Sequence, residues 1–181
     1  MRVVGIDPSL TRTGVAYIDE DPLRVRCYSL PTMGSRYDSV ADTAARIQRI
    51  AIDATLPLAD GAFLLALEAP AYSRHGSSTW DRAGLWWEIT RRAVRDRVPV
   101  ATVAPTTRAR WAAGHGHASK ARVLAAMRAL WPDATIRNHD EADAVALATM
   151  AAQHLGWDVP TLAHHPEPLA TVTWPDLEDA A

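Results

Sequence analysis

The stretch VVGIDPSLTRTGVAYI, residues 3–18, predicts two neighbouring strands joined by a short turn. The first apolar run delivers Asp7, and Pro8 with the polar residues after it cannot continue a central strand. A second apolar run, residues 14–18, then returns as a partner strand. A carboxylate on a mostly buried strand is costly unless it is paired or bound to a metal ion. Asp7 is therefore either half of a salt bridge or part of a metal site.

The remaining periodicity predicts an α/β fold with a mixed five-stranded sheet. Residues 24–30 alternate as a third strand, which makes the first three strands an antiparallel meander. Residues 63–67 and 99–104 are short apolar runs of the kind found in buried strands. Helical spacing separates and follows these runs, so helices are expected on both faces of the sheet. The expected helices cover residues 39–56, 80–97, 105–113, 119–130 and 138–155.

Side-chain signals mark the ends of the helices and of the domain. Ser119 and Asn138 are expected N-caps, and Glu141, three residues after Asn138, matches the pattern of a capping box. Residues 1–157 are expected to form one domain with a sizeable core. Residues 158–181 contain several prolines and no periodicity, and we expect a C-terminal tail of low order there.

Composition excludes several classes of protein. The 181 residues contain no apolar run of about 18 residues, so no segment is expected to span a membrane. The formal net charge of −2 argues against a generic nucleic-acid coat, although one face can still be basic. The single cysteine, Cys27, excludes an intramolecular disulfide and fits a reducing cytosol, which favours a cytoplasmic location. Lys120 is the only lysine among the 19 Lys and Arg residues, which favours a specific role for it.

Acidic residues recur where the predicted elements end. Asp7 ends the first strand, Glu68 ends the fourth, and Asp140 and Asp143 share one face at the start of the last helix. Parallel pairing of the first and fourth strands would bring Asp7 and Glu68 side by side. Four clustered carboxylates repel one another unless cations neutralise them, and hard oxygen ligands favour Mg²⁺ or Mn²⁺. A pair of such ions is a standard apparatus for phosphodiester hydrolysis. Each acid taken singly also fits a structural role, at a helix N-terminus or in a salt bridge.

Other residues suit DNA binding and dimerisation. Trp86 and Trp87 are consecutive in a predicted helix and cannot share one face, so one of them is expected at an exposed dimer interface. A rim of basic side chains would bind DNA with salt-dependent, sequence-independent affinity, although each of them also fits an ordinary solvated position. The expected rim consists of Arg74, His75, Arg82, Arg108, Arg110, His115, His117, Lys120 and Arg122.

Four segments together resemble the characteristic blocks of RuvC-type Holliday junction resolvases, over roughly residues 2–155. They are GIDPSLTRTGVA, LALEAP, APTTRARWAAGHGHASKARVLAAM and HDEADAVALA. The resemblance implies an RNase H-like fold and a homodimer that cuts two strands of a four-way DNA junction with divalent metal. It implies that Asp7, Glu68, Asp140 and Asp143 are the catalytic metal ligands, with two Mg²⁺ ions that Mn²⁺ can replace. Lys120 matches the lysine of the third block, which suits phosphate contact or charge stabilisation in the transition state. We do not place His139 among the ligands, because the three-residue spacing to Asp143 selects Asp140.

Departures from the family pattern leave the preferred DNA open. Tyr72 stands one position later than the family's base-stacking aromatic residue, and Ala109 and Arg110 replace a lysine pair. A phage-type member with broader branched-DNA substrates fits these differences. The alternatives are a YqgF-type nuclease acting on RNA, which the block around Lys120 disfavours, and a catalytically inactive DNA-binding relative, which the intact acids disfavour. A nucleotide-binding module of the sugar-kinase type needs two large lobes, for which this chain is too short.

Overall fold

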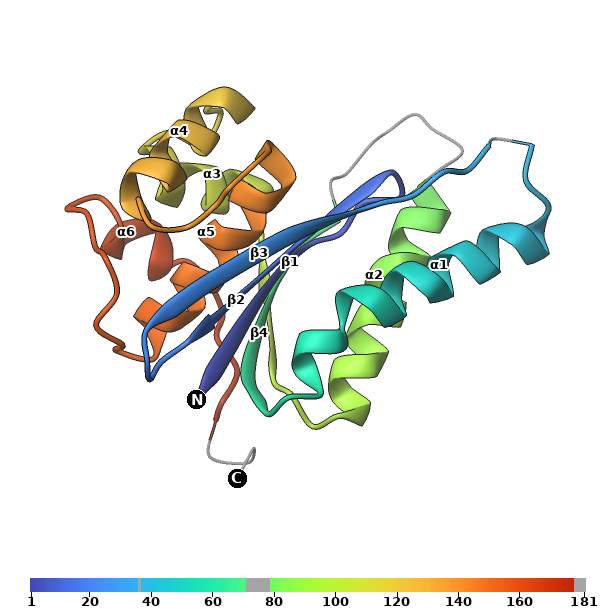
Figure 1. The fold of residues 1–181 in the computed structure, drawn as a ribbon, viewed down its shortest axis with the longest axis horizontal. Coiled ribbons are helices and arrows are strands. Elements are labelled where there is room, and N and C mark those ends of the chain that lie inside the picture. The colour runs from blue at the N-terminus through green and yellow to red at the C-terminus, as the bar shows by residue number, and fades with distance from the viewer. Residues whose placement is uncertain (36, 71–78, 178–181) are drawn as a thin grey trace.

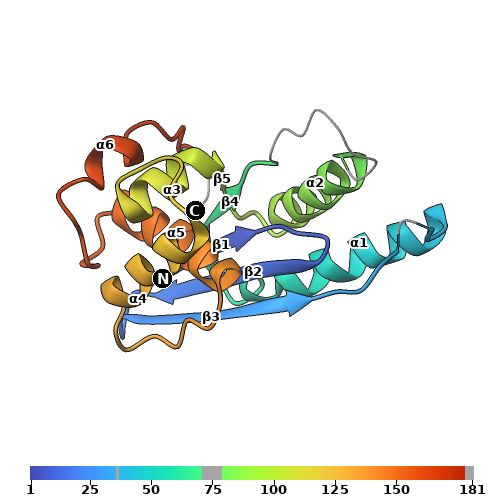
Figure 2. The same cartoon turned by 90° about the horizontal axis from the view of Figure 1, so that it is seen from above.

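The sheet in this computed structural model is an antiparallel meander extended by two parallel strands. The structure describes residues 1–35, 37–70 and 79–177. The strand order is β3-β2-β1-β4-β5, in which β1 pairs antiparallel with β2 and parallel with β4 (Figure 2). The predicted mixed five-stranded sheet is therefore confirmed. The strands are β1 (Arg2–Asp7), β2 (Arg12–Asp19), β3 (Arg24–Pro31), β4 (Ala62–Glu68) and β5 (Val100–Val103).

Helices cover both faces of the sheet (Figure 1). Helices α1 and α2 pack together on one face, and α5 lies on the other with α3, α4 and α6 around it. Side chains of β1 alternate between the two cores, since Val4 and Ile6 pack with α1 and α2 whereas Val3 packs with α5. In the described parts of the chain, no helix has the length and apolar character needed to cross a membrane. The helices are α1 (Val40–Ala54), α2 (Thr79–Arg95), α3 (Pro105–Ala113), α4 (Lys120–Leu130), α5 (His139–His154) and α6 (Pro166–Leu169), with a 3₁₀ turn at Leu56–Leu58.

Two glycines allow α5 to lie close against β1 and β2. A β-carbon at Gly5 would come within 2.3 Å of the Ala144 carbonyl oxygen. A β-carbon at Gly14 would come within 2.0 Å of the Asp140 carbonyl oxygen. Both separations are far below van der Waals contact, so any side chain at either position would push the helix away from the sheet. The glycines of the opening stretch thus set the height of α5 above the sheet.

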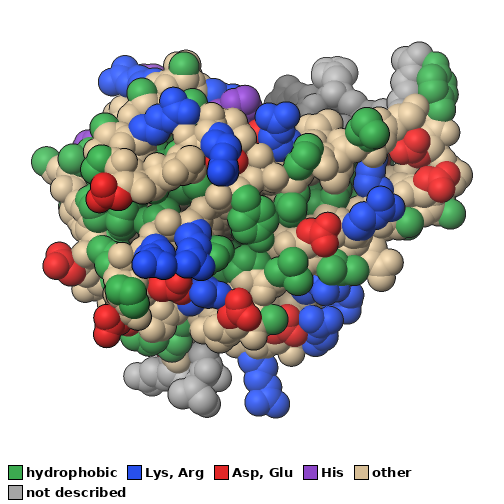
Figure 3. All heavy atoms as spheres, in the orientation of Figure 1, with side chains coloured by type: hydrophobic (Ala, Val, Ile, Leu, Met, Phe, Trp, Pro, Cys, Tyr) green, Lys and Arg blue, Asp and Glu red, His purple; other side chains and the backbone are tan. Residues whose placement is uncertain are grey.

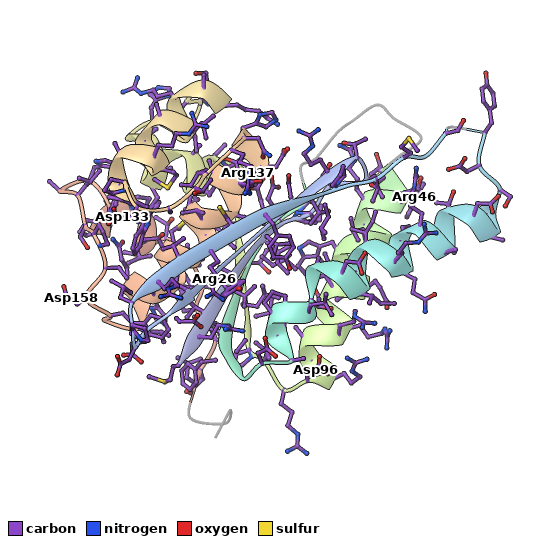
Figure 4. All side chains as sticks on the ribbon, in the orientation of Figure 1. Arg26, Arg46, Asp96, Asp133, Arg137 and Asp158 are labelled. Atoms are coloured by element: carbon purple, nitrogen blue, oxygen red, sulfur yellow. The ribbon has the colours of Figure 1, made fainter. Side chains whose placement is uncertain are left out.

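The predicted N-caps are confirmed, but the predicted capping box is not. Ser119 accepts a hydrogen bond from the backbone of Arg122, and Asn138 accepts one from the backbone of Glu141. The Glu141 carboxylate, however, accepts from the backbone N–H of Arg137 and from the side chain of Asn138, not from the Asn138 backbone. Figure 4 shows Arg137 beside this first turn of α5. Glu141 therefore holds the loop that leads into α5, which keeps the start of the helix in place.

The end of the chain corrects the expectation of a tail of low order. Residues 158–177 pack against α3 and α5, and α6 forms within them. His165 is fully buried and stacks on Trp111 of α3, with ring centroids 4.0 Å apart. Trp174 stacks on His154 at the end of α5, with centroids 4.3 Å apart. The prediction was wrong for these residues because aromatic stacking holds an irregular segment, and stacking across the fold leaves no periodic signal in the sequence.

Candidate active site

Asp7 and Glu68 stand next to each other at one end of the sheet. β1 and β4 run parallel with Ile6 opposite Leu67, and Asp7 and Glu68 are the next residue on each strand. Glu68 is 8% exposed and Asp7 is half-buried. The two carboxylates come from strands that are about 60 residues apart in the sequence. They lie close together because the two strands pair in parallel. The predicted side-by-side placement of Asp7 and Glu68 is confirmed.

Asp140 and Asp143 reach the same end of the sheet from the first turn of α5. Gly14 lies opposite Asp7 in the ladder between β1 and β2, and the backbone of Asp140 sits directly against Gly14. The start of α5 therefore lies over the strand end that carries Asp7. Asp140 and Asp143 are 7% and 2% exposed, and carboxylates are rarely buried this deeply unless they are paired.

Burial and neighbouring carboxylates perturb two of the four acids, Asp7 and Asp143. Burial raises the pKa of Asp7 well above its usual range, and the negative charges of Glu68 and Asp143 raise it further. Burial likewise raises the pKa of Asp143 to about 6, against the opposing effect of Arg108. The acidic neighbours add to the effect of burial on Asp7 and Asp143, and such an environment favours the entry of cations.

Arg108 lies inside the carboxylate cluster. Its Nε donates to Glu68 at 2.7 Å, and its Nη1 donates to Asp143 in a second ion pair. The residue is 8% exposed. Burial lowers the pKa of Arg108, but the charges of Glu68 and Asp143 outweigh burial and raise it overall. Arg108 therefore ties α3 to β4 and to α5.

The position of Arg108 differs from the exposed rim expected from sequence. On α3 the residue precedes Trp111 by three positions and Ala112 by four, and all three are buried. This spacing places them on one face of the helix, so the signal was present in the sequence. The sequence prediction instead followed the general preference of arginine for the protein surface.

Further cations surround the cluster. Lys120, at the exposed start of α4, lies near enough to Asp143 to lower the pKa of that carboxyl. Arg12 places its Nε 3.9 Å from an Asp140 oxygen, a neighbour that the sequence reading missed. His139 places its Nε2 3.5 Å from the other Asp140 oxygen. Lys120 and Arg12 thus form an exposed cationic border on the side of Asp140 and Asp143, with the His139 imidazole beside Asp140.

The expected DNA-binding rim is described only in part. Tyr72, Arg74 and His75 lie outside the described residues. Figure 3 shows Lys and Arg side chains over the end of the molecule that carries α4. Arg110 is paired with Glu167 of α6 at 2.8 Å, so one of the expected rim cations already has a partner. Of the others, Arg82 is partly buried, and His115, His117, Lys120 and Arg122 are exposed.

Trp86 and Trp87 face in different directions, as their adjacency requires. Trp86 packs against the core between α1, α2 and the sheet, whereas Trp87 is 64% exposed. The two rings meet edge to face with centroids 4.9 Å apart. Trp80 and Val94, each seven residues from Trp87, are also exposed, so α2 presents a stripe of three large apolar side chains. An exposed stripe of this kind is typical of a protein interface.

Comparison with known proteins identifies relatives of similar length. No protein-family model matches the sequence. The crossover junction endodeoxyribonuclease RuvC of Rhodopseudomonas palustris strain TIE-1 is 32% identical over 165 residues, which covers 86% of this chain and 89% of the relative. The enzyme of the same name from Acidiphilium cryptum is 32% identical over 162 residues, covering 85% and 92% of the two chains.

Solved structures share the fold. The Thermus thermophilus RuvC structure superimposes with a TM-score of 0.65 at 24% identity, covering 88% of this chain and 99% of that one. The same protein in complex with a Holliday junction substrate gives a TM-score of 0.64 at 21% identity, covering 86% and 97%. The fowlpox virus Holliday junction resolvase gives 0.52 at 11% identity, covering 86% and 99%. The sheet and its helices are thus arranged as in these proteins.

Proposed function

The chain belongs to the RuvC family of crossover junction endodeoxyribonucleases, and we propose that it resolves four-way DNA junctions by cutting two strands through phosphodiester hydrolysis. The observation that carries this proposal is the convergence of Asp7, Glu68, Asp140 and Asp143 at one end of the sheet. Packing alone does not favour such a cluster, since burial and the neighbouring carboxylates raise the pKa of Asp7 and of Asp143.

The donor chemistry of the cluster fits a hard divalent ion. All four side chains offer carboxylate oxygens, which Mg²⁺ and Mn²⁺ prefer over nitrogen or sulfur ligands. We assign the four acids as the metal ligands, and we expect two Mg²⁺ ions per site, with Mn²⁺ as a substitute. When bound, such ions activate water and stabilise charge on the phosphate during hydrolysis.

The chain's own residues then have distinct roles. Lys120 borders the cluster on an exposed helix start, where its ammonium group can contact a phosphate oxygen and stabilise developing negative charge. The exposed basic residues on the α3–α4 connection, His115 and His117, with Arg122 after them, supply contacts to the DNA backbone. These contacts position the DNA backbone. The phosphodiester bond that then lies at the carboxylate cluster is the one that is cut.

Cutting two strands calls for two active sites. We propose that the exposed stripe of α2, with Trp87 at its centre, joins two copies of the chain about a twofold axis. A four-way junction has matching symmetry, so each protomer would cut one of two equivalent strands. The dimer also explains why α2 leaves Trp80 and Trp87 in contact with solvent in the single chain.

The test is cleavage of defined branched DNA by the purified protein. With Mg²⁺ the protein should cut a synthetic four-way junction by paired nicks, and chelation of the metal should stop the reaction. Asp7→Asn and Glu68→Gln should abolish cutting, because each removes a charged ligand. Asp133→Asn is the matched control, since Asp133 is exposed in the loop between α4 and α5 (Figure 4).

A panel of substrates determines the preferred DNA. Four-way, three-way and flapped DNA and an RNA-containing duplex should be compared at equal concentration, with the four-way junction cut fastest. Full activity in Asp7→Asn, or a preference for the RNA-containing duplex, would overturn the proposed function.

A further inference from the structure

Arg108 occupies the side of the carboxylate cluster where a metal ion would have to bind Glu68 and Asp143. Its guanidinium group donates to both carboxylates, and all three residues are at most 8% exposed. Within the described ranges, no three His, Cys, Asp or Glu side chains converge in a geometry that would hold a metal ion. The acids that are suited to a metal by their chemistry are thus arranged around an arginine.

The arginine and a divalent ion compete for the same charge. In a buried site, a carboxylate that has lost its cationic partner is strongly destabilised, so Glu68 and Asp143 need a cation at all times. Arg108 supplies that cation to both carboxylates in the arrangement seen here, and Lys120 at the border lies near Asp143. An incoming divalent ion can use Glu68 and Asp143 as ligands only when Arg108 gives up its bonds to them.

We propose that Arg108 is a displaceable internal counter-ion, which divalent metal releases from Glu68 and Asp143 and which then binds a phosphate of the DNA. This proposal rests on the proposed function and adds a coupling between metal loading and DNA binding. A guanidinium group that leaves two carboxylates can take a phosphate in the same bidentate manner, so its charge remains paired throughout. DNA would in this way favour metal binding, and metal would favour DNA binding to the same degree.

A purely structural role for Arg108 predicts different behaviour. If the residue only ties α3 to β4 and α5, its removal loosens the cluster and leaves metal affinity equal or weaker. If it competes with the metal, its removal makes metal binding tighter in the absence of DNA. The direction of the change in metal affinity therefore separates the two roles.

The experiment is a titration of the full chain with Mn²⁺ alone. Binding is measured by calorimetry or by the electron paramagnetic resonance signal of the free ion. Arg108→Gln should bind Mn²⁺ about tenfold more tightly than the wild type, because the competing charge is gone. Arg108→Lys keeps the positive charge and loses the bidentate geometry of the guanidinium group, so its Mn²⁺ affinity should lie between those of the wild type and Arg108→Gln. This variant replaces Arg108→Gln in the test if the glutamine variant does not fold.

Arg2→Gln is the matched control for these variants. Arg2 is also held by two carboxylates, Asp19 and Asp60, but at the start of β1, the opposite end of that strand from Asp7. Its Mn²⁺ affinity should equal that of the wild type. A general response to the loss of an ion-paired arginine would appear in this control as well.

The coupling is measured by fluorescence anisotropy of a labelled four-way junction, with Ca²⁺ or with EDTA. Ca²⁺ should strengthen junction binding by the wild type and do so much less for Arg108→Gln. Equal or weaker Mn²⁺ affinity in Arg108→Gln, or an undiminished effect of Ca²⁺, would overturn the proposed role of Arg108 alone. Failure of the wild type to bind Mn²⁺ and to cut the junction would overturn the proposed function, and the role of Arg108 with it.

Discussion

Gly14 lies directly against the backbone of Asp140, such that a β-carbon at position 14 would stand 2.0 Å from the Asp140 carbonyl oxygen. Gly14 also pairs with Asp7 across the ladder between β1 and β2. The absence of a side chain at one residue therefore places the first turn of α5 over the strand end that carries Asp7. Two segments separated by more than 120 residues meet at this point.

Gly14→Ala should displace the start of α5 and with it Asp140. We expect the free energy of unfolding to fall by about 1–3 kcal/mol, as for overpacked cores, and junction cutting to fall further than stability alone explains. Urea denaturation and cleavage assays on the folded protein check both effects.

Gly84→Ala is the control for that substitution. Its new β-carbon would lie 3.5 Å from Ile47, an ordinary contact, and alanine is the better helix former by about 1 kcal/mol. Wild-type stability and activity in Gly14→Ala would contradict the role assigned to this close approach.

Two substitutions of the cluster acids should change stability in opposite directions while both abolish cutting. Burial and its acidic neighbours raise the pKa of Asp7, so its charged form is disfavoured in the folded protein at neutral pH. Asp7→Asn removes that charge and should raise the free energy of unfolding by about 0.5–2 kcal/mol. Glu68→Gln removes a partner of buried Arg108 and should lower it by about 1–3 kcal/mol. Urea denaturation in EDTA measures both, and a stabilised Glu68→Gln protein would contradict the ion pair with Arg108.

His165 should make the fold sensitive to acid. Burial, helped by His164, lowers its pKa to about 4, and its Nε2 has no hydrogen-bond partner among the residues that the structure describes. The unfolded chain takes up a proton at this residue near pH 6.5, whereas the folded chain does so only near pH 4. Its contribution to stability is therefore complete above pH 6.5 and is lost as the pH falls toward 4.

His165→Asn tests that contribution. The asparagine oxygen can replace Nδ1 as the acceptor for Gln153 and Leu162, and the side chain cannot become charged. Melting temperatures measured across this pH range should fall less for the variant than for the wild type. Parallel curves for the two proteins would exclude a role for His165 in acid sensitivity.

Trp87→Glu should disrupt the proposed dimer. The Trp87 side chain is 64% exposed and contributes little to the core. The negative charge of the new glutamate should therefore separate the protomers without unfolding them. Sedimentation at micromolar concentration should show a monomer, and paired cutting should become single, uncoordinated nicking. Leu162→Ala, at another exposed apolar residue, is the control and should remain dimeric. A wild-type monomer that cuts both strands together would contradict the interface.

Local patterns in the sequence determined the elements and most of the carboxylate cluster. Alternation and apolar runs define the strands, and polar residues such as Ser119 and Asn138 mark helix starts, because these signals act over a few residues. Asp7 and Glu68 could be predicted as neighbours because parallel pairing brings the ends of two strands to the same edge. The order of elements also predicted the mixed five-stranded sheet with helices on both faces.

Only the tertiary structure decided the partners of Arg108 and the course of residues 158–177. How deeply Arg108 is buried depends on how α3 docks between β4 and α5. The spacing of residues along the sequence does not predict which carboxylates it will contact. The stacking of His165 on Trp111 likewise joins residues far apart in the sequence and stabilises a segment without periodicity. Sequence patterns report contacts along the chain, whereas the charge balance of the site is set by contacts across the fold.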